Sequence, residues 1–258
     1  MSAYDDDDDS PSVSVGGMGR RVQAEYARVA RRGQIREIVF GAQDGLLSTL
    51  ALVTGVRGAD AVRATILVAG LAGALAGTIS MALGAYIAAK SQREVFDYEL
   101  AQEREQLRRR PNVERIELAE IFMNEGLSRS AATRVAEAIS ESEPVMLKTM
   151  AEKELGIRFE AHGSPIQDSA IMGGAFALGA ALPILPYALV SPSAALYLSV
   201  VVTLGALFLL GVAKARLSDA SWWRSGLEIA GLAGAAALLA YVVGNYIPSA
   251  LGIEPPGV

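Results

Sequence analysis

Five long apolar segments constrain the fold of this chain more than any other feature of its sequence. They cover residues 37–57, 62–90, 166–190, 193–213 and 226–247. An α-helix needs about 20 apolar residues to cross the hydrocarbon core of a bilayer, and each segment reaches that length. No segment shows the alternation of apolar and polar residues that is typical of a β-strand. The sequence therefore predicts an all-α membrane protein with five transmembrane helices.

Basic residues predict the orientation of these helices. Those near the first span and between the fourth and fifth are Arg20, Arg21, Arg28, Arg31, Arg32, Arg36, Lys214, Arg216 and Arg224. The connection Ser191-Pro192 and the tail after Ile247 have none. The positive-inside rule then places the N-terminus in the cytosol and the C-terminus outside it, although Arg57 and Arg63 in the first short loop run against this trend.

The segments outside the spans have distinct compositions. Residues 1–19 contain five consecutive aspartates, Asp5 to Asp9, and we expect a disordered acidic tail there. Residues 20–36 have the pattern of a basic amphipathic helix on the membrane surface, and residues 248–258 form a C-terminal tail. The N-terminus lacks the basic start of a signal peptide. The absence of eukaryotic targeting signals favours a bacterial inner membrane, with a vacuolar membrane as the alternative.

A polar insert, residues 91–165, separates the first two spans (37–90) from the last three (166–247). It contains 11 Lys or Arg and 15 Asp or Glu, and two crossings bring it to the cytosolic side. No Gly or Pro interrupts Ala85 to Arg110, so we expect the second span to leave the bilayer as one long helix that ends at Pro111.

Three shorter helices are expected in the rest of the insert. Asn112 is a candidate N-cap for a helix that ends near Gly126, and Ser128 is a candidate for one that ends near Glu141. Pro144 suits the first turn of a third helix, which ends before Gly156. The sequence therefore predicts a helical module joined rigidly to the spans.

Small residues recur at a spacing of four within the spans. They are Gly41 and Gly45, Gly73 and Gly77, Ser80 and Gly84, and Gly226, Ala230 and Gly234. This pattern allows close approach of membrane helices, either within one subunit or at a homodimer interface. Pro183 and Pro186 in the third span indicate either a kink or a helix that lines a cavity.

Asp44 is a charged residue inside the first apolar segment. A carboxylate at that depth costs roughly 2.5 to 3.5 kcal/mol, so it marks a pathway for an ion, proton or substrate. Other candidate donors at the same level are Gln43, Ser48 and Thr49 in the first span and Ser80 and Met81 in the second. A thioether is a soft ligand that suits transition ions rather than alkali ions, but a lone Met also serves as packing.

Carboxylates also recur at helical spacing in the insert. They are Glu99 and Glu103, then Glu114, Glu117 and Glu120, and the last helix adds Met146, Met150, Glu152 and Glu154. One interpretation is a solvated face with Arg104, Arg108 and Arg115 as ion-pair partners. The other is a divalent-cation site, because a bound cation relieves repulsion between like charges on one face.

Several chemistries lack their residues. The chain has no Cys and only one His, His162, which excludes disulfides, thiolate metal sites and the usual ferritin-type di-iron centre. Zinc-protease and P-loop motifs are missing, and no catalytic triad is evident. We therefore expect neither an enzyme nor a nucleic-acid partner.

Three segments resemble the vacuolar iron transporter family, which includes the yeast calcium-cross-complementer type. They are Phe40–Gly55 with its Asp-Gly-Leu motif, Ser80–Tyr86, and Glu154–Ile157 at the end of the insert, and the resemblance covers nearly all of residues 33–247. The resemblance implies a homodimer of five-span subunits with a pore at the dimer interface. It also implies an antiporter that exports Fe²⁺, and often Mn²⁺, from the cytosol in exchange for protons.

The resemblance implies roles for particular residues. Asp44 and Met81 line the pore, and the insert binds metal through Glu103, Glu114, Glu117, Met150 and Glu154. Two positions depart from the family pattern, since Gln106 replaces a second Glu and Ala151 replaces a common second Met. Glu99 or Glu120 are candidate substitutes, and otherwise the module binds fewer ions or binds them more weakly.

The leading hypothesis is therefore a proton-coupled exporter of divalent transition metal. Alternatives are a membrane-anchored metal sensor or buffer, a passive divalent-cation channel, and a lipid enzyme, for which a nucleophile and base are missing. Asp44 argues against a sensor, which needs no charge in the bilayer. Oxygen ligands accept Fe²⁺, Mn²⁺, Co²⁺ and Zn²⁺, so the sequence does not rank these metals.

Overall fold

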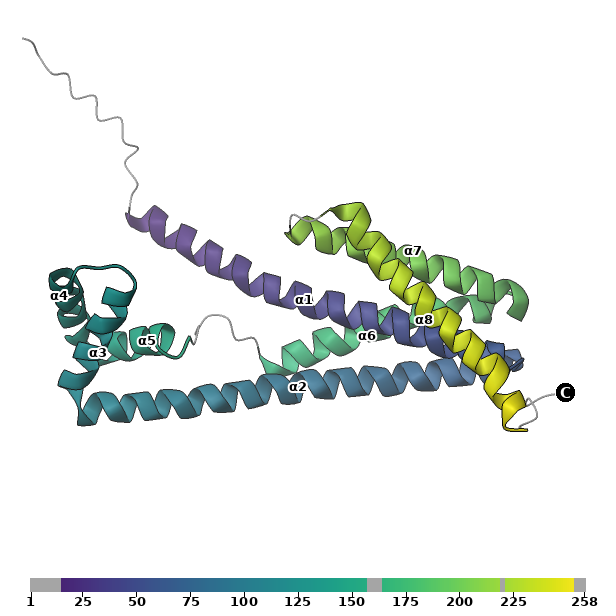
Figure 1. Ribbon diagram of the computed structural model, residues 1–258, viewed down its shortest axis with the longest axis horizontal. Helices are drawn as coiled ribbons and strands as arrows, with labels where there is room; N and C mark the ends of the chain where they lie inside the picture. Colours follow the sequence, from purple (N-terminus) through teal and green to yellow (C-terminus); the bar gives the residue numbers. More distant parts are fainter. Residues whose placement is uncertain (1–14, 157–163, 219–220, 253–258) are drawn as a thin grey trace, which may run out of the picture.

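The computed structural model describes residues 15–156, 164–218 and 221–252, with residues 15–33, 217, 218 and 249 described by their backbone alone. Within this part of the chain the structure is helical and has no strand (Figure 1). The helices are α1 (Val15–Gly58), α2 (Arg63–Arg109), α3 (Pro111–Asn124), α4 (Arg129–Ser140), α5 (Glu143–Lys153), α6 (Pro165–Leu189), α7 (Pro192–Ser218) and α8 (Trp222–Ala250). The predicted all-α class is confirmed.

Five of these helices have the length and composition to cross a membrane. They are α1 from Gln34 onward, α2, α6, α7 and α8, with mean hydropathies between 1.3 and 2.4 over their apolar windows. Each one contains one of the five apolar segments to within one residue at either end, so the predicted number and order of spans are confirmed.

The N-terminal helix is longer than its apolar segment. α1 begins at Val15 and continues through residues 20–36 into the first span without a break, because no proline lies between Pro11 and Pro111. The surface location of residues 20–36 stays a prediction. The acidic tail falls mostly on residues 1–14, and most of the C-terminal tail falls on 253–258; both lie outside the described residues, as does His162.

The second helix connects the spans to the insert. α2 has 47 residues, and a rise of 1.5 Å per residue makes it about 70 Å long, more than twice the thickness of the hydrocarbon core. Figure 1 shows α2 extending along the whole molecule, with α3, α4 and α5 at one end and α6, α7 and α8 around the other. Pro111 ends α2, as predicted, because proline cannot donate the next helical hydrogen bond.

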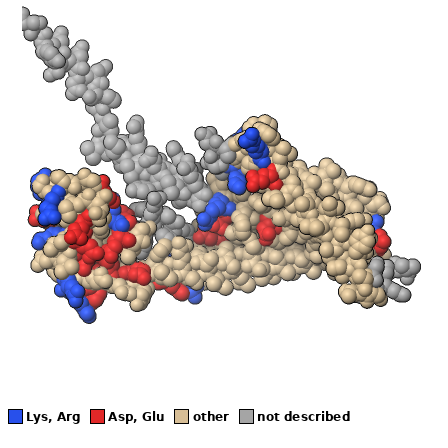
Figure 2. All heavy atoms as spheres, viewed as in Figure 1, with Lys and Arg blue, Asp and Glu red and all other residues tan. Residues whose placement is uncertain are grey.

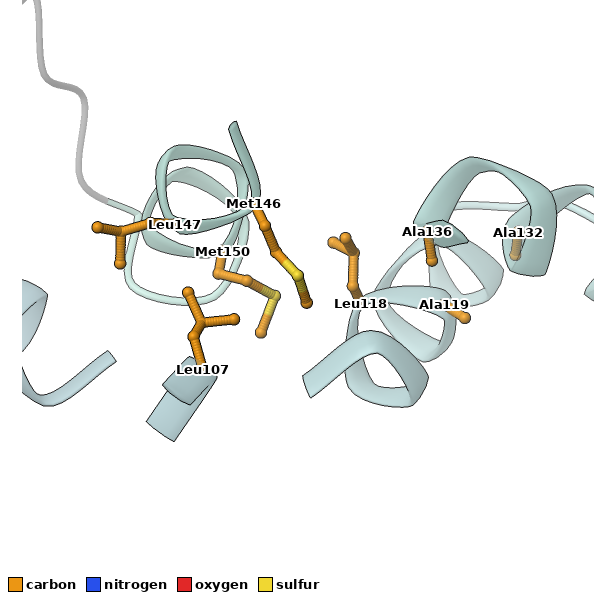
Figure 3. Packing of buried hydrophobic residues seen from close by; sticks show 8 residues of the cluster. All are labelled: Leu107, Leu118, Ala119, Ala132, Ala136, Met146, Leu147 and Met150. Atoms are coloured by element: carbon orange, nitrogen blue, oxygen red, sulfur yellow. The ribbon is translucent and has the colours of Figure 1, made fainter. Parts of the chain in front are cut away.

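A small apolar core holds the module of α3, α4, α5 and the end of α2 together. Its members are Leu107, Leu118, Ala119, Ala132, Ala136, Met146, Leu147 and Met150 (Figure 3). Ser128 caps α4 as predicted, since its Oγ accepts a hydrogen bond from the Ala131 amide at 3.4 Å. The predicted cap of α3 is wrong: Arg110 occupies the N-cap and Asn112 lies in the first turn, because Pro111 is pre-organised for the first helical position.

Glycines set the packing of the membrane-spanning helices, and α1 contacts α6 and α8 most closely. A Cβ at Gly45 would lie 2.2 Å from the Phe176 carbonyl oxygen, and one at Gly244 would lie 1.9 Å from the Gly55 carbonyl oxygen. Gly41, Gly73, Gly77 and Gly226 also meet neighbours within the chain. These glycines therefore serve packing within one subunit. Ser80 and Gly84 are exposed, and a Cβ at Gly84 would meet nothing within 4 Å, so a homodimer interface stays a prediction for that pair.

The two prolines of α6 are buried in protein. Both Pro183 and Pro186 lie inside the helix, and the buried Ser199 hydroxyl on α7 donates a hydrogen bond to the Pro183 carbonyl at 2.8 Å. This contact supports the α6 backbone where proline interrupts the regular hydrogen bonds.

Candidate functional site

A pocket of about 220 Å³ lies between α1, α2 and α6. Its lining residues are Asp44, Ser48, Thr49, Leu52, Gly73, Gly77, Ser80, Met81 and Phe176. The structure thus brings together Asp44, Ser48, Ser80 and Met81, which the sequence singled out on separate helices. Gln43 is half-buried and is not among the lining residues, because one residue along a helix turns a side chain by about 100°.

Among the described residues that line the pocket, Asp44 supplies the one carboxylate, and the other polar groups are hydroxyls and a thioether. The Ser48 hydroxyl donates to the Asp44 backbone carbonyl at 2.6 Å, so its proton is used within α1 while its oxygen lone pairs stay available. Thr49 is 2% exposed, whereas Asp44 is half-buried. Carboxylate, hydroxyl and thioether groups therefore face a shared space, and this donor set suits a transition-metal ion better than an alkali ion.

Leu52 and Phe176 are apolar lining residues that sequence reasoning missed. Phe176 comes from α6, more than 90 residues after the neighbouring Met81 along the chain. Helical periodicity shows only which residues share a face of one helix. It therefore does not predict which side chain of another helix lines the same pocket. The local signals are Gly73 and Gly77, because the lack of a side chain makes room for Leu52 at Gly73 and for the Phe176 ring at Gly77.

A second group of predicted residues gathers in the module. Glu103 on α2 and Glu114 on α3 are only 3% and 4% exposed, and Glu103 Oε1 and Glu114 Oε2 have no hydrogen-bond partner among the described residues. Burial, followed by the charges of Glu154, Glu114 and Glu117, raises the pKa of Glu103 to about 7. Figure 2 shows acidic residues gathered on one face of the module.

The same causes act on two further carboxyl groups. Burial, followed by the charge of Glu117, raises the pKa of Glu114, while Arg110 lowers it. Burial, followed by the charges of Glu117 and Glu114, raises the pKa of Glu154. Carboxylates from α2, α3 and the end of α5 therefore lie within electrostatic reach of one another, although Glu154 follows Glu103 by about 50 residues.

The solvated-face interpretation is wrong for the two buried glutamates. Two of the nearby arginines pair elsewhere: Arg108 Nε lies 3.3 Å from Glu143 Oε1, and Arg109 Nε lies 2.6 Å from Glu105 Oε1. Glu120 is exposed and fits the solvated face, and Glu99 is half-buried. Burying a charged carboxylate without a partner is costly, so Glu103 and Glu114 are expected to bind either a proton or a cation.

Met150 lies inside the module's apolar core. It is fully buried, and Figure 3 shows its side chain pointing toward Leu107 and Met146. Leu107 follows Glu103 by one turn of α2, so the Met150 thioether packs about one helical turn from Glu103. Ala151, the next residue along α5, is also fully buried.

The carboxylates do not form a finished metal centre. Among the described residues, no group of three or more Asp, Glu, His or Cys has the spacing of assembled ligands. A larger groove of about 570 Å³ between α2 and α5 is lined by Arg104, Arg108, Glu143 and Lys148 with apolar neighbours, and it contains none of the predicted site residues. The acidic cluster of Glu103, Glu114, Glu117 and Glu154 therefore supplies carboxylate oxygens near one another without forming an assembled metal site.

Comparison with known proteins covers most of the chain. A family model described as the VIT family matches residues 35–245. The chain is 34% identical over 214 residues to vacuolar iron transporter 1 of Arabidopsis thaliana, an alignment that spans 83% of this chain and 86% of that protein. It is 34% identical to vacuolar iron transporter 2 of Oryza sativa subsp. japonica, over 83% of this chain and 88% of that one. Protein CCC1 of Saccharomyces cerevisiae is 26% identical over 72% of this chain and 59% of its own length.

Proposed function

Because this chain belongs to the VIT family, whose members are transporters rather than enzymes, we propose that it exports Fe²⁺ from the cytosol across a membrane in exchange for protons. The observation that carries this proposal is the shared pocket of Asp44 and Met81 within the membrane-spanning helices. The names of the relatives support iron as substrate. Mn²⁺ is proposed as a second substrate, and Co²⁺ and Zn²⁺ suit the same donors.

The chemistry of Asp44 explains how one site serves both ions. An unpaired carboxylate in hydrocarbon is costly, so it holds either a cation or a proton. A metal ion that leaves the pocket is replaced by a proton, and the reverse exchange resets the site. Met81 adds a soft ligand that favours transition ions over Mg²⁺ and Ca²⁺.

We propose that two copies of the chain form the pore. One chain supplies one Asp44 and one Met81 to a pocket that is open at its surface, and α2 is the least buried of the five spans, at 11% of its apolar window. Exposed apolar residues follow one another along α2, at Val68, Leu71, Leu75, Ile79, Leu83, Ile87, Val95 and Tyr98. Lipid covers the first six positions, but Val95 and Tyr98 lie beyond the predicted end of the span, where a second protein surface is the natural cover.

A cysteine at Val95 should link two copies. The chain has no native Cys, so Val95→Cys gives a single reporter. We expect oxidation to produce a covalent dimer, because facing helices pack about 8 to 10 Å apart. Val113→Cys on α3 is a matched control, since Val113 and Val95 are exposed to similar extents, 51% and 56%. A monomeric mass in native mass spectrometry would contradict the dimer.

We propose that the module lies in the cytosol, with the N-terminus, and gathers metal for the pore. Glu103, Glu114, Glu117 and Glu154 supply oxygen ligands, and Met150 reaches the ion after a small rearrangement of the core. The unpartnered oxygens of Glu103 and Glu114 support this role, because a cation offsets the cost of their burial. Glu99 and Glu120 are secondary candidates.

Replacing two of these ligands should weaken metal binding by the full-length protein. We expect Glu114→Ala with Glu117→Ala to lower Mn²⁺ affinity about tenfold or more in calorimetric titration, and to slow transport without stopping it. The control is Glu137→Ala with Glu141→Ala, which removes the same charge from exposed positions at the end of α4. Equal effects of the two double variants would restore the solvated-face interpretation.

The same titration has an expected pH dependence. Because the pKa of Glu103 is raised to about 7, this carboxyl is protonated in the metal-free protein below neutral pH. A metal must then displace the proton, so affinity should fall as the pH decreases from 8 to 6. Affinity that stays constant over this range would argue against Glu103 as a ligand.

Metal uptake by sealed proteoliposomes is the decisive experiment for the function as a whole. An exporter moves Fe²⁺ across the bilayer, whereas a sensor or buffer binds it without transport. We propose a multi-pass location in the bacterial inner membrane, or the vacuolar membrane in a eukaryotic host. The basic residues on the N-terminal side of α1 support a cytosolic N-terminus.

A further inference from the structure

Phe176 closes the inner side of the membrane pocket. It is 3% exposed, and among the described residues that line the pocket it alone comes from α6. The polar donors come from α1 and α2, so Phe176 stands on the side of the pocket that faces the interior of the subunit.

Two glycines fix Phe176 against both donor helices. A Cβ at Gly45, which directly follows Asp44, would lie 2.2 Å from the Phe176 carbonyl oxygen. A Cβ at Gly77, one turn before Met81, would lie 2.2 Å from Cζ and 2.5 Å from Cε1 of the ring. The backbone of Phe176 therefore touches α1 at Gly45, next to Asp44, and its ring touches α2 at Gly77, one turn before Met81.

We propose that Phe176 determines ion selectivity: its ring sets the space between the Asp44 and Met81 helices and excludes water from the inner side of the pocket. This inference rests on the proposed transport function. Phe176 is a positioning residue, because it acts on the ion through the two donors and the water around it.

The wall acts on the inner side of the ion. A volume of about 220 Å³ has room for an ion with several water molecules at about 30 Å³ each. Phe176 offers no oxygen on its side, so an ion that binds Asp44 and Met81 directly loses part of its hydration shell there. Mg²⁺ loses water reluctantly and gains little from a thioether, whereas Fe²⁺ accepts both ligands and Mn²⁺ gives up its water more readily than Mg²⁺. An apolar wall that denies the ion extra water therefore selects against Mg²⁺.

A smaller side chain at this position should weaken discrimination against Mg²⁺. In Phe176→Leu, the space that the ring vacates admits water, and a partly hydrated Mg²⁺ then competes for Asp44. The assay is Mn²⁺ uptake by proteoliposomes at increasing Mg²⁺. We expect the Mg²⁺ concentration for half-inhibition to fall about tenfold, the lower range for a change of this size in an apolar pocket.

A second substitution should reverse this change. Gly77→Ala places a methyl group where the ring lay, so Phe176→Leu with Gly77→Ala should regain most of the resistance to Mg²⁺. Gly77→Ala alone pushes the intact ring toward the ion, and we expect slower Mn²⁺ uptake with discrimination retained. The single Gly77→Ala variant keeps the test informative if Phe176→Leu folds poorly.

Phe208 on α7 offers a matched control away from the pocket. Its ring packs on Gly226 of α8, where a Cβ would lie 2.6 Å from Cδ2 and Cε2. Phe208→Leu removes the same ring from the same kind of contact, and Mg²⁺ inhibition should equal that of the wild type. A shift as large as in Phe176→Leu would reduce the effect to lost packing and overturn the inference.

The outcomes separate this inference from the proposed function. Wild-type transport of Mn²⁺ or Fe²⁺ with unchanged Mg²⁺ inhibition in Phe176→Leu overturns the role of Phe176 alone. A wild-type protein that transports neither metal overturns the proposed function instead.

Discussion

Asp44→Asn should reduce metal transport by at least about a hundredfold. At 4 Å and an effective dielectric constant of about 20, a pair of unit charges interacts by roughly 4 kcal/mol, and each 1.4 kcal/mol corresponds to a factor of ten. The amide keeps the shape of the side chain but removes both the charge that attracts the metal and the site that accepts the proton. Uptake of Mn²⁺ and Fe²⁺ into proteoliposomes measures the loss.

Asp60→Asn is the control for this substitution. Asp60 makes an exposed ion pair with Arg57 at 3.1 Å in the loop after α1, outside the pocket. It adopts a φ of 53°, a conformation that asparagine tolerates well. We expect wild-type transport from Asp60→Asn and the same detergent-solubilised mass for both variants. Transport at the wild-type rate by Asp44→Asn would disprove the assignment of the pore.

A pH gradient should drive Fe²⁺ movement strongly when the receiving compartment is acidic. Moving a divalent cation against a membrane potential costs about 4.6 kcal/mol per 100 mV, twice the value of roughly 2.3 kcal/mol for one charge. Export into a positive compartment therefore needs an opposing flux. Protons that bind Asp44 after the metal leaves supply that flux.

This coupling has two observable signatures in liposomes. A pH-sensitive dye should report that the lumen becomes more alkaline as metal enters, and an ionophore that collapses the gradient should slow uptake severalfold. The Asp44→Asn variant should show neither signal, which excludes leakage through the lipid. Rates that do not respond to the ionophore would favour a passive channel.

The module illustrates where prediction from sequence stops. The sequence indicated Glu103, Glu114 and Glu117 by spacing, but spacing alone allowed a solvated face. Only the packing of α2 against α3 and α5 buries Glu103 and Glu114 and brings Glu154 within electrostatic reach. Burial is a property of contacts between distant segments, so a single helical pattern does not contain it.

Local sequence determined the number, order and length of the helices of this protein. The length and hydropathy of five segments set the spans, because lipid offers no hydrogen bonds to the backbone and so imposes helices. An uninterrupted stretch up to Pro111 set the length of α2, and the depth of Asp44 in its segment marked a position that lines the membrane pocket. Each of these properties depends on residues close together along the chain.

Tertiary structure decided which side chains share a space. It placed Phe176 between the Asp44 and Met81 helices, left Gln43 off the pocket, and used the Gly41, Gly45 and Gly77 positions for packing within one chain. The physical reason is that helical periodicity fixes the direction of a side chain only relative to its own helix. The neighbour that it meets depends on how helices cross, and close contacts at glycines such as Gly45 set those crossings.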